Sequence, residues 1–401
     1  MTGTIDPKLE ATRQARASRA PLLVFADDWG RHPSSCQHLV RRLLPRHDVT
    51  WVNTIMRPPR LDWATIRRGW EKARQWLSAS SDSANGSAEP APKVVNPRMW
   101  PWFSSPAHRR LNRWMLSRQL EPLVRRASAP AIAITTLPIA ADLIGALPVH
   151  RWVYYCVDDF TIWPGLDGRA LQIMEKDLVE RVDEIIVVSE TLRAKMAEMG
   201  RTAHVLTHGI DLPFWSCGDS EAPTAIESLE KPLAVFWGVV DRRMSVDMIR
   251  RLAQQLERGT VVLAGPVNDP DPELLRVPRV VSLGPLPFEQ LPALARQAAV
   301  LIMPYADLPV TRAIQPLKLK EYLATGRPVV VADLPATREW GDCLDLANDP
   351  DSFAALVDAR IQAGLPDAQR AARRRLSQES WDAKAHDFEN WICGDPTPSL
   401  P

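Results

Sequence analysis

The sequence predicts an α/β protein built from two doubly wound domains that face each other across a cleft. Its 401 residues exceed what one ordinary core organises, so two domains of about 150–200 residues are expected. In each half, short apolar runs alternate with helical patterns, which is typical of parallel strands joined by crossover helices. A stretch without apolar periodicity separates the halves. Each half is therefore predicted to be a Rossmann-like domain.

The first domain is predicted over residues 1–216. It opens with an apolar strand, a polar loop and a helical stretch at 36–47. The strands expected in this domain are 21–26, 49–54, 131–136, 151–157 and 183–189. The irregular segment 78–93 is rich in Ser, Ala and Pro, and it is expected to be a loop within this domain.

The second domain is predicted over residues 233–378. It follows a linker at 217–232, which is rich in small, acidic and proline residues and poor in periodicity. The strands expected in this domain are 233–238, 259–265, 279–284, 299–305 and 327–333. Residues 379–401 are predicted to form a final helix and a tail.

The bulk composition excludes several classes of protein. With 45% hydrophobic residues and a formal net charge of +1, the chain is not expected to bind nucleic acid. The polar opening stretch lacks an apolar leader, and no run reaches the roughly 18 apolar residues of a spanning helix, so a cytoplasmic protein is predicted. The five cysteines are scattered without a CxxC, which argues against a zinc site and a disulfide framework.

The strongest candidate site lies in the segment 314–330. Doubly wound sheets bind ligands beyond the carboxyl ends of their strands, where helices begin. Pro316 is expected in the first turn of a helix, so Lys318 sits where backbone N–H groups favour a diphosphate. Glu321 follows on roughly the same face and can accept both hydroxyls of a ribose. The alternative is a surface helix with an incidental Lys/Glu pair.

Two further glycine positions are candidate donor contacts. Gly238 ends a predicted strand, and Arg242 or Arg243 follows within reach of a phosphate. Solvated arginines at a helix start are the alternative for either residue. Gly209 lies in a turn just before the linker, where its backbone could face the cleft.

Two adjacent carboxylates end the predicted strand 151–157. Neighbouring residues of a strand point to opposite sides, so Asp158 and Asp159 are not expected to share one role. One of them could be the general base that accepts a proton from an acceptor hydroxyl, and a turn or helix cap is the alternative. His32, in the loop after the first strand, is the rival base because an imidazole titrates near neutral pH.

Other phosphate and metal motifs give no support to competing chemistries. The Asp-Pro-Asp segment 269–271 matches the metal-binding Asp-x-Asp motif. Because Asp-Pro is common in turns, however, no metal site is predicted there. No GxGxxG follows a strand and no GxxxxGK[ST] occurs. Dinucleotide redox chemistry and P-loop hydrolysis are therefore not expected.

Two segments of the first domain interleave arginines with tryptophans. Residues 55–77 and 97–126 are much more basic than the whole chain. Basic residues beside interfacial aromatic residues suit the surface of an anionic membrane. The alternative is that these are ordinary helices whose tryptophans fill the core.

The motifs, in chain order, resemble those of GT-B glycosyltransferases over most of the sequence. They are YYCVDDFTIWPG (154–165), VVSETL (187–192), VLTHGID (205–211), FWGVVDRR (236–243), VVLAGPV (261–267), PLKLKEYLATGRPVV (316–330) and SWDAKAHDFENWI (380–392). The chain resembles enzymes of bacterial cell-surface polysaccharide assembly, such as teichuronic-acid glycosyltransferases and, more distantly, the xanthan glucuronosyltransferase.

This resemblance implies a function and roles for particular residues. Asp158 would be the catalytic base of an inverting enzyme, Lys318 would bind donor phosphate and Glu321 would hold the ribose. The final helix would pack back on the first, acceptor-binding domain. Many retaining relatives carry a glutamate eight positions before Glu321, where this chain has Ala313, so inversion is favoured.

The expected activity is transfer of a hexosyl or glycuronosyl group, without a metal or other cofactor. The donor would be a nucleotide diphosphate sugar such as a UDP-sugar, and the acceptor a lipid-linked saccharide at the inner face of the cytoplasmic membrane. Two other interpretations stay open, namely a nucleotide-sugar 2-epimerase of the same fold and a catalytically silent scaffold in a membrane assembly complex.

Overall fold

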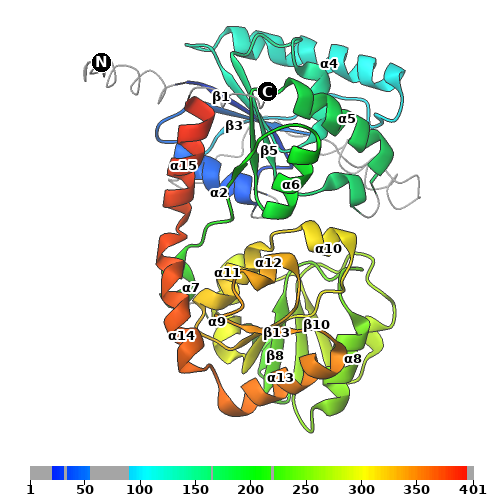
Figure 1. The fold of residues 1–401 in the computed structure, drawn as a ribbon, viewed down its shortest axis with the longest axis vertical. Coiled ribbons are helices and arrows are strands. Elements are labelled where there is room, and N and C mark those ends of the chain that lie inside the picture. The colour runs from blue at the N-terminus through cyan, green and yellow to red at the C-terminus, as the bar shows by residue number, and fades with distance from the viewer. Residues whose placement is uncertain (1–19, 31–33, 55–89, 164–165, 218–220, 395–401) are drawn as a thin grey trace.

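The protein consists of two α/β domains stacked along the long axis of the molecule (Figure 1). The computed structural model describes residues 20–30, 34–54, 90–163, 166–217 and 221–394. Each domain contains one fully parallel sheet covered by helices, so the predicted pair of doubly wound domains is confirmed.

The first sheet has seven parallel strands in the order β3-β2-β1-β4-β5-β6-β7. They are β1 (Leu22–Ala26), β2 (Val49–Asn53), β3 (Lys93–Val95), β4 (Ile132–Thr135), β5 (Arg151–Cys156), β6 (Glu184–Val187) and β7 (His204–Val205). The register of β1 places Val24 opposite Trp51 on one side and Ile134 on the other. All three side chains are buried, which explains why these strands are continuous apolar runs.

The helices of the first domain begin at capped positions. They are α2 (Ser35–Leu43), α4 (Pro106–Arg125), α5 (Gly168–Arg181) and α6 (Glu190–Glu198), with short 3₁₀ turns η1 (Pro138–Leu143) and η2 (Phe160–Ile162). Before each of the four α-helices, a side chain from Ser34, Ser105, Asp167 or Ser189 accepts a hydrogen bond from a backbone N–H of the first turn.

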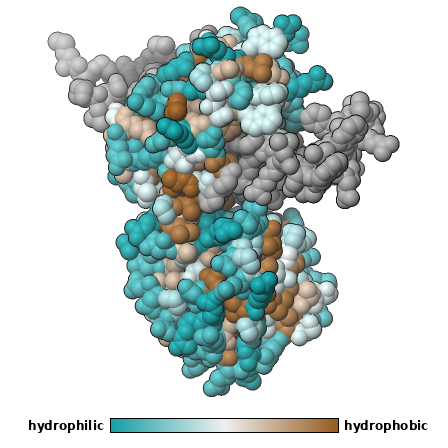
Figure 2. All heavy atoms as spheres, turned by 90° about the vertical axis from the view of Figure 1, so that its right-hand side faces the viewer, coloured by the Kyte–Doolittle hydropathy of each residue, from teal (hydrophilic) through white to brown (hydrophobic). Residues whose placement is uncertain are grey.

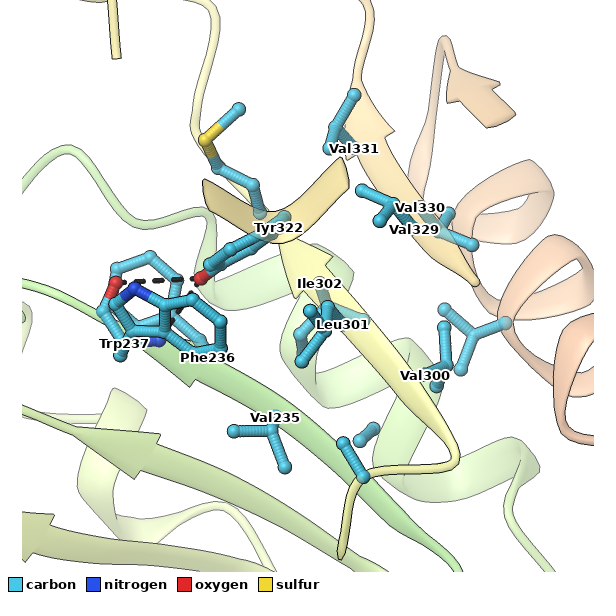
Figure 3. Packing of buried hydrophobic residues seen from close by; sticks show 14 of the residues in the cluster. Val235, Phe236, Trp237, Val300, Leu301, Ile302, Tyr322, Val329, Val330 and Val331 are labelled. Atoms are coloured by element: carbon cyan, nitrogen blue, oxygen red, sulfur yellow. Dashed lines mark hydrogen bonds between the residues drawn. The ribbon is translucent and has the colours of Figure 1, made fainter. Parts of the chain in front are cut away.

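The second sheet has six parallel strands in the order β10-β9-β8-β11-β12-β13. They are β8 (Leu233–Trp237), β9 (Thr260–Ala264), β10 (Val280–Gly284), β11 (Val300–Met303), β12 (Val329–Ala332) and β13 (Asp345–Ala347). Figure 3 shows side chains of β8, β11 and β12 packed together in the core of this domain. The sequence did not indicate β3 or β13, whose three-residue strands are too short for a recognisable apolar pattern.

The helices of the second domain cover both faces of its sheet and continue into the C-terminal segment. They are α7 (Leu212–Cys217), α8 (Val246–Gln255), α9 (Leu291–Gln297), α10 (Pro309–Ala313), α11 (Leu317–Ala324), α12 (Pro335–Arg338), α13 (Pro350–Ala363), α14 (Asp367–Ala372) and α15 (Trp381–Cys393). Four 3₁₀ turns accompany them, at η3 (Thr224–Ile226), η4 (Leu274–Arg276), η5 (Phe288–Gln290) and η6 (Arg373–Gln378).

The chain passes between the domains at two adjacent places. Helix α15 returns to the first domain and packs on α2, with Trp381 and Phe388 buried in the first core (Figure 1). At the crossing, the backbone N–H of Ile210 donates to the carbonyl of Glu379 at 2.8 Å. Ile210 and Trp215 already belong to the second core, so the packing favours a crossover before the proposed linker at 217–232.

Several sequence predictions lie wholly or partly outside the described residues. They are the candidate base His32, the basic segment 55–77 and residues 78–89 of the expected loop. Lys93, which the sequence analysis left in that loop, is the first residue of β3. Within the described ranges, no helix combines the length and apolar character needed to cross a membrane.

Candidate functional site

A pocket of about 420 Å³ opens at the carboxyl end of β8. Strand β8 lies between β9 and β11, where the strand order of the second sheet reverses, and such switch points are where doubly wound sheets bind ligands. The volume is within the usual range for small-molecule sites. The pocket is lined by His38, Trp237, Gly238, Val239, Ala264, Gly265, Pro266, Pro285, Leu286, Phe288, Leu291, Leu317, Lys318 and Glu321. Because His38 belongs to α2, both domains contribute to the pocket.

Two glycines allow a side chain and the backbone to meet closely in this pocket. Gly238 and Gly265 have φ angles of 133° and 143°, which favour glycine. A Cβ atom on Gly238 would lie 2.0 Å from Nζ of Lys318, and one on Gly265 would lie 2.0 Å from the carbonyl oxygen of Gly238. Glycine is therefore required at both positions, and the lysine lies directly against the strand-end backbone.

Lys318 is a fixed, half-buried cation in the pocket. It lies in the first turn of α11, and its Nζ donates to the hydroxyl of Tyr305 at 2.8 Å. The same ammonium group lies 4.3 Å from the ring centroid of Phe236. A lysine held in this way beside exposed backbone suits an anionic group such as a diphosphate.

Glu321 lies one turn further along α11 and is held by the end of β8. Nε1 of Trp237 donates to its carboxylate at 3.1 Å. Burial raises the pKa of Glu321 to about 7, although this hydrogen bond and the charge of Lys318 oppose the shift. The next residue, Tyr322, accepts a hydrogen bond at its hydroxyl from the backbone N–H of Trp237 at 3.0 Å (Figure 3).

The two adjacent carboxylates of the first domain have different surroundings. Asp159 accepts from the backbone N–H of Thr161 at 3.1 Å and from Nζ of Lys195 at 2.8 Å. Lys195 also pairs with the fully buried Glu175 at 2.5 Å. Asp159 therefore caps η2 and belongs to a network of charged residues, which is the turn-and-cap role that the sequence left open.

Asp158 differs from Asp159 in that its carboxylate has no such partners among the described residues. No hydrogen bond from any described residue reaches its carboxylate. Burial raises the pKa of Asp158 to about 7, against the effect of the nearby Arg243, while the neighbouring Asp159 and Asp27 add to the increase. A half-buried carboxylate with a pKa near neutrality is matched to general-base catalysis at physiological pH.

The two candidate arginines point in different directions. Arg243 donates through Nε to Asp241 at 2.9 Å, and its guanidinium group lies 5.3 Å from the ring centroid of Trp163 in the first domain. It thus reaches across the cleft towards Asp158. Arg242 is exposed and pairs with Asp269 at 3.0 Å. Neither arginine is among the pocket-lining residues, but Arg243 lies between the domains beside Trp163, whereas Arg242 is held at the surface by Asp269.

The other sequence candidates have structural explanations. A Cβ atom on Gly209 would lie 2.6 Å from the ring of Trp381, so this glycine makes room for α15 and is not among the pocket-lining residues. Asp269 of the Asp-Pro-Asp segment is engaged by Arg242. No group of three or more His, Cys, Asp or Glu side chains in the described part of the chain is arranged to hold a metal ion.

Two residues at or near the pocket were not predicted as site residues from the sequence. His38 lines the pocket and stacks on Trp381, with ring centroids 4.5 Å apart, and burial lowers its pKa to about 4. Lys320 is almost fully buried, and its Nζ donates to the carbonyl of His208 at 2.6 Å and pairs with Glu379. Its position between Lys318 and Glu321 was visible, but nothing in the sequence indicated that a lysine would be buried at the domain crossing.

Comparisons with known proteins agree with this geometry. Residues 231–362, within the second domain, match the family model described as glycosyl transferases group 1. TuaH of Bacillus subtilis, which is assigned to teichuronic acid biosynthesis as a glycosyltransferase, is 30% identical over 210 residues. The match covers 47% of this chain, and the chain spans only 53% of that relative's length.

Solved structures that cover 92–94% of this chain show that its fold is GT-B. Sucrose-phosphate synthase from Thermosynechococcus elongatus superposes with a TM-score of 0.66 at 14% identity, covering 92% of this chain and 97% of the other. HepE of Anabaena, in complex with UDP and glucose, gives 0.65 at 15% identity, covering 92% and 98%. A UDP-forming α,α-trehalose-phosphate synthase from Burkholderia xenovorans gives 0.65 at 13% identity, covering 94% and 100%.

Proposed function

We propose that this GT-B protein, whose second domain matches the group 1 glycosyltransferase family model, is a glycosyltransferase that uses a nucleotide diphosphate sugar. The observation that carries the proposal is the pocket at the switch point of the second sheet, where Lys318, Gly238 and Glu321 converge. It opens towards the first domain, which contributes His38 to its lining and presents Asp158 to Arg243 across the cleft.

The donor would lie in the pocket with its diphosphate against the glycine backbone. Lys318 would contact a phosphate oxygen, exchanging its hydrogen bond to Tyr305 for one to the anion. Glu321 would accept hydrogen bonds from the ribose hydroxyls, held in place by Trp237. The apolar loop with Pro285, Leu286 and Phe288 would enclose the base. Two structural neighbours support UDP, since HepE was solved with UDP and the Burkholderia synthase is UDP-forming.

Asp158 would act as the general base of the transfer. An acceptor hydroxyl oxygen attacks the anomeric carbon of the donor sugar and gives its proton to the Asp158 carboxylate. The bond between the anomeric carbon and the β-phosphate oxygen breaks, and its electron pair leaves with the nucleoside diphosphate. Lys318 and Arg243, which lie 5.2 and 5.6 Å from the ring centroid of Tyr305, would stabilise the negative charge of that leaving group. Inversion at the anomeric carbon follows if the hydroxyl attacks from the face opposite the diphosphate.

The finer assignment concerns the acceptor and the cellular place. We propose transfer of a hexosyl or glycuronosyl group to a lipid-linked saccharide during cell-surface polysaccharide assembly, by a protein on the inner face of the cytoplasmic membrane. The partial match to TuaH supports the pathway class. The arginine-rich helix α4, which carries the exposed Trp114, supports the peripheral location. No metal is needed in this mechanism, because lysine and arginine supply the positive charge.

The test is thermal stabilisation by UDP, GDP, ADP and their sugar conjugates, followed by product analysis with the donor that binds. A ligand that binds only the folded state raises the melting temperature, so stabilisation by one nucleotide family supports the transferase. If a folded sample is stabilised by none of these ligands, the protein is instead a catalytically silent scaffold. Turnover of the donor to a 2-epimer without any acceptor would instead identify an epimerase. Loss of transfer on EDTA treatment, restored by a divalent cation, would contradict the metal-independent mechanism.

A further inference from the structure

Helix α4 presents an outward face that is both cationic and aromatic. Its buried face consists of Asn112, Leu116, Leu120 and Val124, which turn towards the first domain. Around the rest of the helix, Arg110, Leu111, Arg113, Trp114 and Arg118 are all exposed, with Arg113 at the edge of the buried face. Trp114 is 60% exposed, although a tryptophan gains more than most residues from burial. The guanidinium group of Arg118 lies 5.9 Å from the Trp114 ring centroid, so aromatic and cationic groups adjoin on this exposed surface.

The arginines on this face differ in their pairing. Arg109 is neutralised, since its guanidinium group contacts Asp142 at 2.7 Å and Asp177 at 2.6 Å. In contrast, Arg110 and Arg113 have no ion pair with any carboxylate in the described part of the chain. The face therefore carries positive charge that no carboxylate of the described residues balances, although the net charge of the whole chain is only +1.

A groove of about 270 Å³ lies between α4 and α5 beside this face. Arg110 and Arg113 form part of its wall, together with Phe103 and the exposed Ile173 of α5. Ile173 is 55% exposed, so the groove has a cationic side and an apolar edge. Figure 2 views the molecule from the side on which α4 and α5 lie in Figure 1, and apolar residues are scattered among hydrophilic ones on the upper domain.

We propose that this α4–α5 face docks the protein onto an anionic lipid bilayer. Arg110 and Arg113 contact lipid phosphate groups at the groove, and Trp114 and Leu111 enter the interfacial layer. This combination of basic and interfacial aromatic side chains on one helix face is the chemistry that anionic bilayers recognise. A folded protein partner would fit the apolar residues but would leave the arginines in need of matching acids. The inference deepens the proposed peripheral location, and its test does not depend on sugar transfer.

The test is sedimentation of the full chain with vesicles of phosphatidylcholine alone and of phosphatidylcholine mixed with phosphatidylglycerol. We expect binding to the anionic vesicles only, weakened by added salt because surface charges are screened. Reversing two charges, in Arg110→Glu/Arg113→Glu, should weaken the partition by about tenfold or more. Trp114→Ser should weaken it by a few-fold, at unchanged net charge.

The matched control is Arg258→Glu/Arg374→Glu, which makes the same charge change at two exposed arginines of the second domain. It should bind the vesicles as the unmodified chain does. Melting temperatures and UDP stabilisation, measured for every variant, separate loss of docking from loss of folding or of the donor site. Three results would each overturn the inference: no binding to anionic vesicles at low salt, equal weakening in the control pair, or full displacement by inorganic phosphate at constant ionic strength.

Discussion

The two sheets meet across the cleft with opposite chemistry at their carboxyl ends. The first domain presents carboxylates, with Asp27 after β1 and Asp158 after β5. The second presents Gly238 and Gly265 after β8 and β9, with Lys318 lying against them. Carboxylates can accept a proton but repel a diphosphate, whereas glycine backbone and a lysine attract one. The contrast supports the proposal that the first domain acts on the acceptor and the second holds the donor.

A second contrast concerns Asp158 and Glu321, the carboxyl groups on the two sides. Burial raises the pKa of each to about 7, yet Glu321 accepts a hydrogen bond from Trp237 and Asp158 accepts none from a described residue. A fixed carboxylate is suited to orienting hydroxyl groups, and a free one is suited to taking a proton. Burial is common to both carboxyl groups and therefore does not distinguish their roles. The hydrogen bond from Trp237, which only Glu321 accepts, does.

The largest expected effect is on turnover in Asp158→Asn. Without the general base, transfer should fall by about 10²–10⁴-fold, because an amide cannot accept the proton. The affinity for UDP should remain unchanged, as Asp158 lies on the other side of the cleft. Initial rates and UDP titration check both parts.

Asp159→Asn is the matched control, because it makes the same change one residue away. It should lower the free energy of unfolding by about 1–3 kcal/mol through the lost pair with Lys195. If this variant lost more transfer activity than Asp158→Asn, the assignment of the two carboxylates would have to be exchanged.

The next effect is on donor binding in Lys318→Ala. Loss of one charge-assisted contact should weaken the affinity for UDP by about 10–100-fold, equivalent to roughly 1.5–3 kcal/mol of binding free energy. Arg242→Ala removes an equal charge outside the pocket and is the control. Calorimetric titration with UDP is the measurement for both variants. An equal loss of UDP affinity in the two would contradict the role of Lys318.

The pH dependence of the free energy of unfolding distinguishes Asp158 from an ordinary surface carboxylate. Its pKa in the folded state is about 7, above the ordinary value of 3.8, so the folded state binds the proton more tightly. Stability is therefore lost as pH rises from about 4 through 7. Asp158→Asn should be more stable than the unmodified chain at pH 8, by on the order of 2 kcal/mol, and equal to it near pH 4. Denaturant unfolding at the two pH values is the measurement, and a constant difference would contradict the raised pKa.

The smallest expected effect distinguishes the two arginines. Arg242→Ala should leave transfer within about twofold, since its partner Asp269 is also on the surface. Arg243→Ala should lower kcat, because it removes a cation that lies beside both Asp158 and Tyr305. Equal kcat values in the two variants would remove Arg243 from the site.

The sequence was sufficient for the fold because its apolar runs are long and regular. Ten of the expected strands overlap strands of the structure, and the alternation with helices determined the parallel sheets. At the site, Lys318 and Glu321 could be singled out because Pro316 and Gly326 bracket a helix that leads into the buried strand β12. The division between Asp158 and Asp159 followed from strand alternation.

Other site residues could not be predicted, because their roles depend on contacts between distant segments. Gly209 faces Trp381, which lies in the last helix. Arg242 turns away from the pocket to Asp269. His38 enters the pocket only because the two domains meet there. None of these contacts has a periodic or local signal in the sequence.

The most direct test of the division between the domains is a side-by-side calorimetric titration of UDP into Asp158→Asn and Lys318→Ala. The account predicts unchanged affinity in the first variant and affinity weakened by about 10–100-fold in the second. If Asp158→Asn lost UDP affinity while Lys318→Ala kept it, the donor would lie on the first domain and the proposed arrangement would be wrong.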